Sequence, residues 1–256
     1  MKPIGRNCRD AVLYKPNGDT YTMKNLLSSN ADAKTIKGQK FGFLTGILYM
    51  APSDISGHQV CPSAKLAGCE SACLYTAGRG AMSYTQKARI AKTKRFFEER
   101  DAFMADLVWS IKALQRKALR MGLTPLVRLN GTSDIAYENI EYQGKTIFAH
   151  FPDLAFYDYT KLPTRKNIPA NYDLTFSYSG VKSFAPLVAK ANANSALSRI
   201  AVVFDKAENI PKTFMFTDVI GGDNSDIRHL EPKGVVVALY AKGKARQDKS
   251  GFVVRQ

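Results

Sequence analysis

The sequence predicts an α/β fold: a parallel sheet arranged like a partial (β/α) barrel, preceded by an N-terminal β-hairpin. Apolar strand candidates alternate with helical patterns beyond residue 40, which favours βαβ units with parallel pairing. Nearly every candidate strand stays apolar until its last residues, where Asn, Thr, Ser, Asp or Lys appears. This pattern is typical of parallel sheets whose sites lie at the carboxyl ends of the strands, although turns are polar in any fold.

The N-terminal region is predicted to form a hairpin and then one buried strand. Residues 11–23 read as the hairpin, because Asn17 and Gly18 supply the positive φ values of a tight turn. A polar stretch over residues 28–40 leads into residues 41–50, which are apolar on both faces. Such a run is expected of a strand in the middle of a sheet.

Residues 83–121 have the pattern of a long amphipathic helix. Apolar side chains recur at intervals of three, four and seven, at Phe96, Phe103, Leu107, Ile111, Leu114 and Ala118. One unbroken helix of that length would span ~57 Å, so we expect a break near residues 98–101. Gly122 is placed to cap the end and Pro125 to prevent continuation.

The remaining chain is predicted to add strands and one helix to the same sheet. The strands are expected at residues 126–129, 154–157, 174–177, 199–204 and 235–240, and the helix at residues 184–192. There is no internal repeat and no evident domain boundary. We therefore expect one domain over residues 1–256, with a hairpin extension at 1–25 and a metal-bearing core at 41–245.

The chain is strongly basic, with 37 Lys and Arg against 22 Asp and Glu and a net charge of +15. Such an excess attracts polyanions, so nucleic acid or an anionic substrate is the expected partner. Four basic residues of the helical region are expected to contact phosphates: Lys92, Arg95, Lys112 and Arg116. No segment reaches the ~18 apolar residues of a membrane span, and the N-terminus lacks an apolar export segment. A reducing cytoplasm is therefore expected.

Three of the four cysteines form a C-x7-C-x3-C run, Cys61, Cys69 and Cys73, while Cys8 stands apart. Clustered thiols in a chain without secretory features are more often metal ligands or redox centres than disulfides. Three thiolates suit an iron–sulfur cluster of the 4Fe-4S type with one open iron. A zinc site is the alternative, in which His58 completes a Cys3His set. Unligated thiols are the third reading.

Polar residues at the predicted strand ends are candidates for contact with a substrate: Asn130, Thr132, Asp134, Ser177, Ser179, Asp223, Asp226 and Lys242. Asp134 is equally placed to cap a helix. Asp223 and Asp226, with Asn224, could bind a divalent cation, or could form a surface turn in which Arg228 pairs with an aspartate. Because parallel strands deliver their carboxyl ends to one face, several of these residues are expected beside the thiols.

Three segments carry a resemblance to a known family. Residues 57–80, which contain the cysteines, residues 86–89 (Gln-Lys-Ala-Arg) and residues 127–134 (Val-Arg-Leu-Asn-Gly-Thr-Ser-Asp) resemble the gene product 88 family of bacteriophages. The similarity extends from about residue 26 to residue 245. It implies a phage or prophage origin, and hence the host cytoplasm. Some members are labelled as replication initiators, which implies a link to DNA replication.

A looser similarity connects the chain with radical S-adenosylmethionine enzymes. In those enzymes a three-cysteine loop follows the first strand of a partial (β/α)6 barrel and ligates a 4Fe-4S cluster. The resemblance implies S-adenosylmethionine as a further candidate cofactor. The chain departs from the C-x3-C-x2-C signature in both gaps, and its aromatic residue, Tyr75, follows the last cysteine rather than preceding it. These departures count against S-adenosylmethionine more than against the cluster.

Two functional hypotheses follow. The first is an iron–sulfur enzyme acting on a nucleotide, nucleic acid or other polyanion. The second is a non-catalytic, DNA-binding phage replication factor whose cysteines hold structural zinc. A phage protein that acts on host proteins is a third class, for which the sequence offers no positive sign.

Overall fold

The computed structural model describes residues 12–14, 20–22, 24–29, 33–73, 75 and 78–255. Its centre is a nine-stranded sheet with the strand order β11-β12-β13-β10-β9-β8-β5-β4-β3. Six neighbours in this sheet are parallel and follow one another in chain order: β4 (Phe43–Leu48), β5 (Thr124–Arg128), β8 (Ala155–Thr160), β9 (Tyr172–Ser177), β10 (Arg199–Phe204) and β13 (Val236–Tyr240). The predicted parallel α/β sheet is therefore confirmed.

The sheet is extended at both edges by strands that the sequence did not predict. The strand β3 (Leu27–Ser29) pairs antiparallel with β4. At the other edge, β12 (Thr217–Gly221) pairs parallel with β13 and antiparallel with β11 (Thr213–Phe214). These strands are short and half-exposed, so they lack the apolar runs by which the central strands were recognised.

Two further pairs of short strands lie outside this sheet. The predicted N-terminal hairpin is confirmed by β1 (Val12–Tyr14) and β2 (Thr20–Thr22), which pair antiparallel, while its expected turn at Asn17 and Gly18 lies outside the described residues. The second pair is β6 (Glu141–Tyr142) and β7 (Lys145–Thr146).

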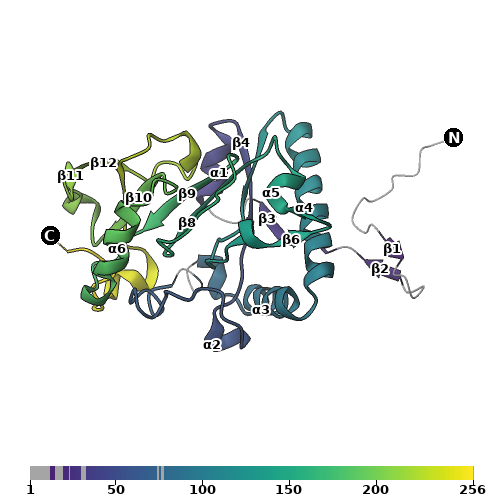
Figure 1. Ribbon diagram of the computed structural model, residues 1–256, viewed down its shortest axis with the longest axis horizontal. Coiled ribbons are helices and arrows are strands. Elements are labelled where there is room, and N and C mark those ends of the chain that lie inside the picture. The colour runs from purple at the N-terminus through teal and green to yellow at the C-terminus, as the bar shows by residue number, and fades with distance from the viewer. Residues whose placement is uncertain are drawn as a thin grey trace.

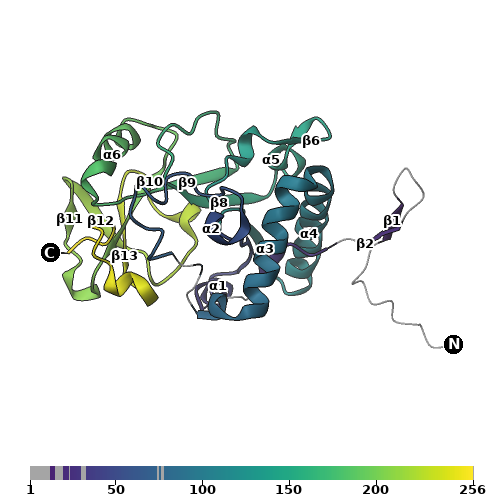
Figure 2. The ribbon, with the colours of Figure 1, turned by 90° about the horizontal axis from the view of Figure 1, so that it is seen from below.

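The helices lie in the connections between strands. The α-helices are α1 (Ala33–Gln39), α2 (Ser53–Ser56), α3 (Ser83–Glu98), α4 (Arg100–Arg120), α5 (Ile147–His150) and α6 (Ala185–Asn192). Short 3-10 helices are η2 (Gly78–Ala81), η3 (Tyr137–Asn139), η4 (Lys182–Phe184), η5 (Ala207–Asn209), η6 (Arg228–Leu230) and η7 (Gly243–Gln247). Figures 1 and 2 show α3 and α4 together at one end of the molecule and α6 at the other. No helix among the described residues is long and apolar enough to cross a membrane.

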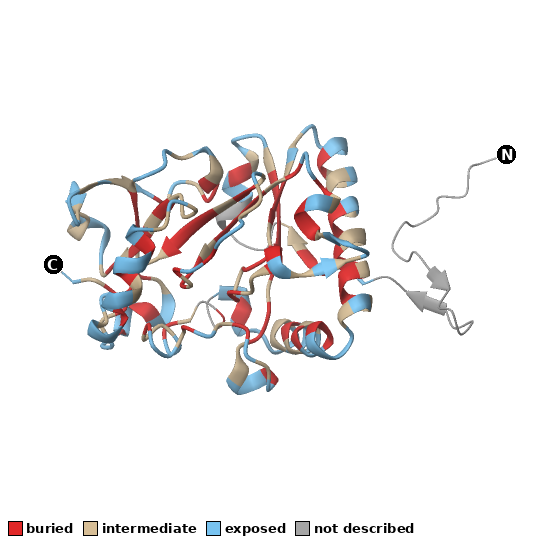
Figure 3. Ribbon diagram, in the orientation of Figure 1, coloured by how far each residue is buried: buried red, intermediate tan, exposed pale blue. Residues whose placement is uncertain are grey.

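The long helical pattern breaks where expected. Glu99, between α3 and α4, leaves the helical conformation with φ −133° and ψ 54°. The six apolar side chains of the predicted stripe are all buried in the main core between α4 and the sheet. Gly122 follows α4 with φ +63°, and the Leu123 N–H closes the end by donating to the Ala118 carbonyl at 3.0 Å. Figure 3 shows buried residues concentrated in the strands and on the inner faces of these helices.

The carboxyl ends of the parallel strands face two irregular segments. One is the cysteine loop, residues 57–73, which follows β4 and α2. The other is the C-terminal segment, residues 248–255, in which Val254 forms a parallel bridge with Phe204 at the end of β10. Figure 1 shows both segments at the end of the sheet toward which the arrow of β9 points.

Candidate functional site

The three cysteines of the loop are half-buried and form no disulfide. Cys69 Sγ lies 3.6 Å from the Ala64 carbonyl oxygen, and Cys73 Sγ accepts from the Tyr75 N–H at 3.5 Å. Burial raises the pKa of each thiol, and the charges of Cys69 and Cys73 raise the pKa of Cys61 further. The use of the three thiols as one ligand set stays a prediction, and Cys8 lies outside the described residues.

A buried lysine that sequence reasoning did not select faces this group. Lys161 follows β8, and its ammonium donates to Ser177 at the end of β9, at 2.9 Å to Oγ and 3.1 Å to the carbonyl. It also lies 4.8 Å from the centre of the Phe252 ring. Burial lowers the pKa of Lys161, while the nearby thiols of Cys69 and Cys61 oppose that shift. The Lys161 side chain is thus held by Ser177 at the end of β9.

Asp134 joins the cysteine loop to the ends of β5 and β8. Its N–H donates to the Val60 carbonyl at 2.7 Å, directly before Cys61. Its carboxylate accepts from the Thr160 hydroxyl and the Lys161 N–H, both at 2.7 Å. Burial raises the pKa of Asp134, and its charge contributes to the raised pKa of Cys61. Asp134 is therefore a fixed anion that orients the loop and the backbone of Lys161.

Behind Asp134 lies a buried ion pair. Arg165 donates to Glu138 through two nitrogens, and the contact from Nη2 to Oε2 measures 2.7 Å. The same guanidinium lies 3.3 Å from Asp134 Oδ1 and 3.4 Å from the hydroxyl of Tyr172. Because Arg165 and Glu138 are both buried, each depends on the other for charge compensation.

Three hydrogen bonds attach the site loops to the sheet and to the C-terminal segment. The Ser179 hydroxyl donates to the Ala67 carbonyl at 2.7 Å, and the Ser250 hydroxyl to the Gly68 carbonyl at 3.0 Å. The Gly131 N–H donates to the Leu48 carbonyl at the end of β4 at 3.0 Å. Segments far apart in sequence thus fix the backbone around the thiols.

Gly131→Ala is expected to lower the free energy of unfolding by about 1–3 kcal/mol, because it overpacks this junction. A Cβ at residue 131 would lie 2.5 Å from Ile47 Cγ2 and 2.9 Å from the Leu48 carbonyl oxygen. Gly221→Ala is the control, since no atom lies within 4 Å of a Cβ there. Urea unfolding would measure both, and equal losses in the two variants would contradict the close approach at Gly131.

Asn130 and Thr132 hold the loop after β5 together and do not present free groups to a ligand. The Asn130 amide accepts from the Ile135 N–H and Ser133 hydroxyl, both at 2.8 Å, and donates to the Ile135 carbonyl at 2.9 Å. Thr132 exchanges hydrogen bonds with the backbone of Met50. Ser179 is likewise buried against Ala67. The expectation that these three side chains contact a substrate is corrected, because their polar atoms are already bonded within the protein.

Asp223 and Asp226 do not form a shared cation site. Asp223, which follows β12, accepts from the Tyr240 N–H at 3.0 Å. Its carboxylate also pairs with Lys242 at 2.5 Å, so Asp223 and Lys242 form an ion pair beside the end of β13. Asp226 is buried and accepts from Arg128 at 2.9 Å and from the Tyr157 hydroxyl at 3.1 Å. The alternative reading, a surface turn in which Arg228 pairs with an aspartate, is confirmed for the pairing, since Arg228 Nη2 lies 3.6 Å from Asp226 Oδ1, but both residues are buried.

His58 does not point at the thiols. Its Nε2 atom lies 3.2 Å from Glu98 Oε1, and its ring stacks on Phe97 with centroids 4.6 Å apart. Among the described residues, no group of three or more His, Cys, Asp and Glu side chains is arranged to hold a single metal ion.

Of the four predicted phosphate contacts, Arg95 is buried and Lys92 is half-buried. Arg95 is buried and pairs with Asp106, so its expected role is corrected. Lys92 donates to the Leu26 carbonyl at 3.3 Å, and burial lowers its pKa to about 8. Lys112 and Arg116, one turn apart on α4, are exposed as expected. The ammonium of Lys92 and the guanidinium of Arg95 are thus engaged by the Leu26 carbonyl and by Asp106.

Comparison of the chain with known proteins identifies one matching family. No curated protein and no solved structure shows a significant similarity to the chain, and the looser likeness to radical S-adenosylmethionine enzymes has no counterpart among the matches. A family model described as Gene product 88 matches residues 23–256, which include the sheet, the cysteine loop and the C-terminal segment. The chain therefore belongs to the gene product 88 family of bacteriophage proteins.

Proposed function

We propose that this phage protein carries a 4Fe-4S cluster on Cys61, Cys69 and Cys73 and is an enzyme acting on an anionic substrate of the nucleotide class. The observation that carries the proposal is the grouping of three thiols beside buried Lys161, where the ends of parallel strands converge. In open parallel sheets this end is where ligands bind. Three cysteine ligands leave one iron of such a cluster free to bind substrate or cofactor.

The donor set favours a cluster over a single ion. A single zinc needs a fourth ligand beside the three cysteines, and His58, the candidate for that place, has its Nε2 atom 3.2 Å from Glu98 Oε1. A four-iron cluster spreads its cysteine ligands over separate irons, so its sulfur atoms stand farther apart. The Lys161 ammonium would offset the negative charge of a cluster held by three thiolates. When bound, the cluster would supply one-electron chemistry and one open iron.

S-adenosylmethionine is the candidate cofactor for that iron. Support comes from the topology, since six parallel strands follow in chain order and the cysteine loop comes after the first of them. The cysteine spacing differs from that of radical S-adenosylmethionine enzymes, so the topology is the main support. A cluster of this type is best kept in a reducing compartment, and we place the protein in the host cytoplasm.

Metal analysis of anaerobically purified protein tests the proposal. We expect about four iron and four acid-labile sulfide per chain, as a 4Fe-4S cluster requires. About one zinc per chain would instead support the structural-zinc alternative. Protein without either metal, before and after anaerobic reconstitution with iron and sulfide, would refute the cluster.

The exposed basic residues of α4 support nucleic acid as one form of the anionic partner. Lys112→Glu combined with Arg116→Glu is expected to weaken binding to single-stranded DNA and to reduce the slope of log K against log salt by about two, one per lost phosphate contact. Fluorescence anisotropy over about 50–200 mM salt would measure this slope. Lys190→Glu combined with Lys233→Glu, two exposed positions elsewhere, is the control for net charge. Equal effects of the two pairs would exclude a contact specific to α4.

A further inference from the structure

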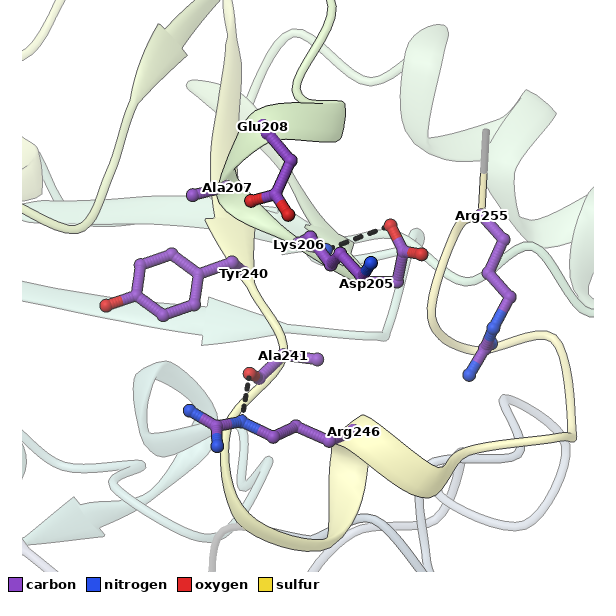
Figure 4. Close-up of a pocket in the computed structure, with 8 residues that line it drawn as sticks. All are labelled: Asp205, Lys206, Ala207, Glu208, Tyr240, Ala241, Arg246 and Arg255. Atoms are coloured by element: carbon purple, nitrogen blue, oxygen red, sulfur yellow. Dashed lines mark hydrogen bonds between the residues drawn. The ribbon is translucent and has the colours of Figure 1, made fainter.

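A second concave site, separate in its residues from the thiols, lies at the carboxyl ends of β10 and β13. It has a volume of about 490 Å³, within the range of pockets that hold small molecules. Asp205 directly follows β10, while Tyr240 is the last residue of β13 and Ala241 the next. The two strands are parallel neighbours, so their ends open on the same edge of the sheet. The side chains that line it include those of Asp205, Lys206, Glu208, Tyr240, Arg246 and Arg255. In Figure 4 Tyr240 lies on one side of the close-up, Asp205 and Arg255 on the other, and Arg246 below.

Three cations of this pocket are available to a ligand. Lys206, Arg246 and Arg255 are exposed, and none of them forms an ion pair with another described residue. Arg246 is oriented by its Nε, which donates to the Ala241 carbonyl at 3.4 Å and leaves the terminal nitrogens free of described partners. Guanidinium groups recognise phosphate oxygens through paired N–H donors. The pocket therefore has the charge and geometry to bind a phosphate group.

The remaining lining residues indicate a ligand that carries other groups besides phosphate. Tyr240 is half-buried and offers part of an aromatic ring, on which Lys242 lies at 4.5 Å from the ring centre. Asp205 and Glu208 supply carboxylates, and Asp205 is held in place by the Asn209 amide at 2.8 Å. A site for a simple anion gains nothing from two carboxylates. A ring, hydrogen-bond acceptors for hydroxyl groups, and cations for phosphate together match the three parts of a nucleotide.

The pocket also adjoins the cysteine loop. Ala241 and Ala245 belong to the same small apolar cluster as Ala72, and Cys69 packs against it. The segment that carries Arg255 also contributes Phe252 to this cluster, beside Lys161. A ligand in the pocket would therefore lie on the far side of a thin apolar layer from the thiols.

We propose that this pocket binds a nucleoside phosphate, with Arg246 and Arg255 on the phosphates, Tyr240 against the base, and Asp205 or Glu208 on the sugar hydroxyls. This inference rests on the proposed function only for the role of the nucleotide as substrate, since binding of the nucleotide requires no cluster. The ligand is a free nucleotide or one nucleotide of a single strand, and the two sources share the same chemistry.

Isothermal titration calorimetry of the full chain with ADP, pyrophosphate, adenosine and an eight-nucleotide single strand tests the assignment. ADP is expected to bind more tightly than either pyrophosphate or adenosine. Arg246→Gln combined with Arg255→Gln should weaken ADP binding by at least about tenfold, while the matched exposed control Arg120→Gln should change it less than about twofold. Arg246→Lys combined with Arg255→Lys, which retains both charges, should recover part of the affinity.

Tyr240→Leu separates base from phosphate recognition, because it should weaken ADP but leave pyrophosphate unchanged. If ADP does not bind, but the oligonucleotide binds and loses affinity in the variant with both arginines replaced, the ligand is a nucleotide of a single strand and the nucleoside-phosphate assignment stands. Pyrophosphate binding as tightly as ADP, or ADP and oligonucleotide affinities that ignore the arginine pair, would overturn it. The same titration on metal-free protein and on protein reconstituted with iron and sulfide separates the two proposals, because ADP binding by metal-free protein supports the pocket assignment whatever the metal analysis gives.

Discussion

Replacing Cys69 by serine is expected to abolish cluster retention, reducing iron from about four per chain to less than about one. Serine is a poor ligand for the soft iron–sulfur centre, and two remaining thiolates cannot hold a four-iron cluster in water. Cys61→Ser and Cys73→Ser should have the same effect, because the cluster is proposed to use all three thiolates of the C-x7-C-x3-C run. Iron, acid-labile sulfide and the electron paramagnetic resonance spectrum of the reduced protein measure the loss.

Cys8→Ser is the matched control for this prediction. It removes the one cysteine that stands apart in the sequence, so cluster content should stay at the wild-type level. A Cys8→Ser variant as depleted in iron as Cys69→Ser would show that the ligand set is misassigned. Unchanged iron content in all four variants would place the metal elsewhere.

Arg165→Met is expected to lower the free energy of unfolding by about 3–5 kcal/mol, the range for breaking a buried ion pair by removal of one partner. The substitution leaves the Glu138 carboxylate buried without its bidentate partner and removes a compensating charge 3.3 Å from Asp134. Because Asp134 holds the entry to the cysteine loop, the loss should also loosen the thiol site. Urea unfolding followed by circular dichroism measures the change in stability.

Lys166→Met supplies the control, since Lys166 is the exposed neighbour of Arg165 and the same side chain is introduced. Its effect should stay within about 0.5 kcal/mol, as for most surface substitutions. A loss of less than about 1 kcal/mol in Arg165→Met would mean that Glu138 and Asp134 are compensated without the guanidinium. Arg165→Lys should recover only part of the stability, because an ammonium cannot reproduce the bidentate contact.

Much of the central sheet could be predicted because its strands are apolar on both faces. The strand predicted over residues 199–204 has the same bounds as β10, and the strand predicted at residues 235–240 begins one residue before β13. The break near Glu99 followed from helix length and from the apolar spacing on either side. Such features depend on local sequence, so they are visible without the fold.

The composition of the site could be predicted only in part. The nearness of Asp134 to the cysteine loop, where its N–H donates to the Val60 carbonyl, followed from the rule on parallel strand ends. Lys161 was missed, although it ends a predicted strand, because nothing local distinguishes a buried lysine from an exposed one. Asn130 and Thr132 were taken for ligand contacts because a polar side chain after a strand reads the same whether it binds a ligand or the backbone.

The sequence by itself determined which segments become central strands and helices, and where the long helix breaks. Each of these depends on residue type and spacing along a few turns or one strand, where local periodicity and burial coincide. Only the tertiary structure decided which polar groups bond within the protein, as Asp226 does with Arg128. It also decided which groups keep atoms without a partner among the described residues, as the terminal nitrogens of Arg246 do. That division depends on contacts between residues as much as 182 positions apart, such as Ser250 and Gly68, which no local pattern encodes.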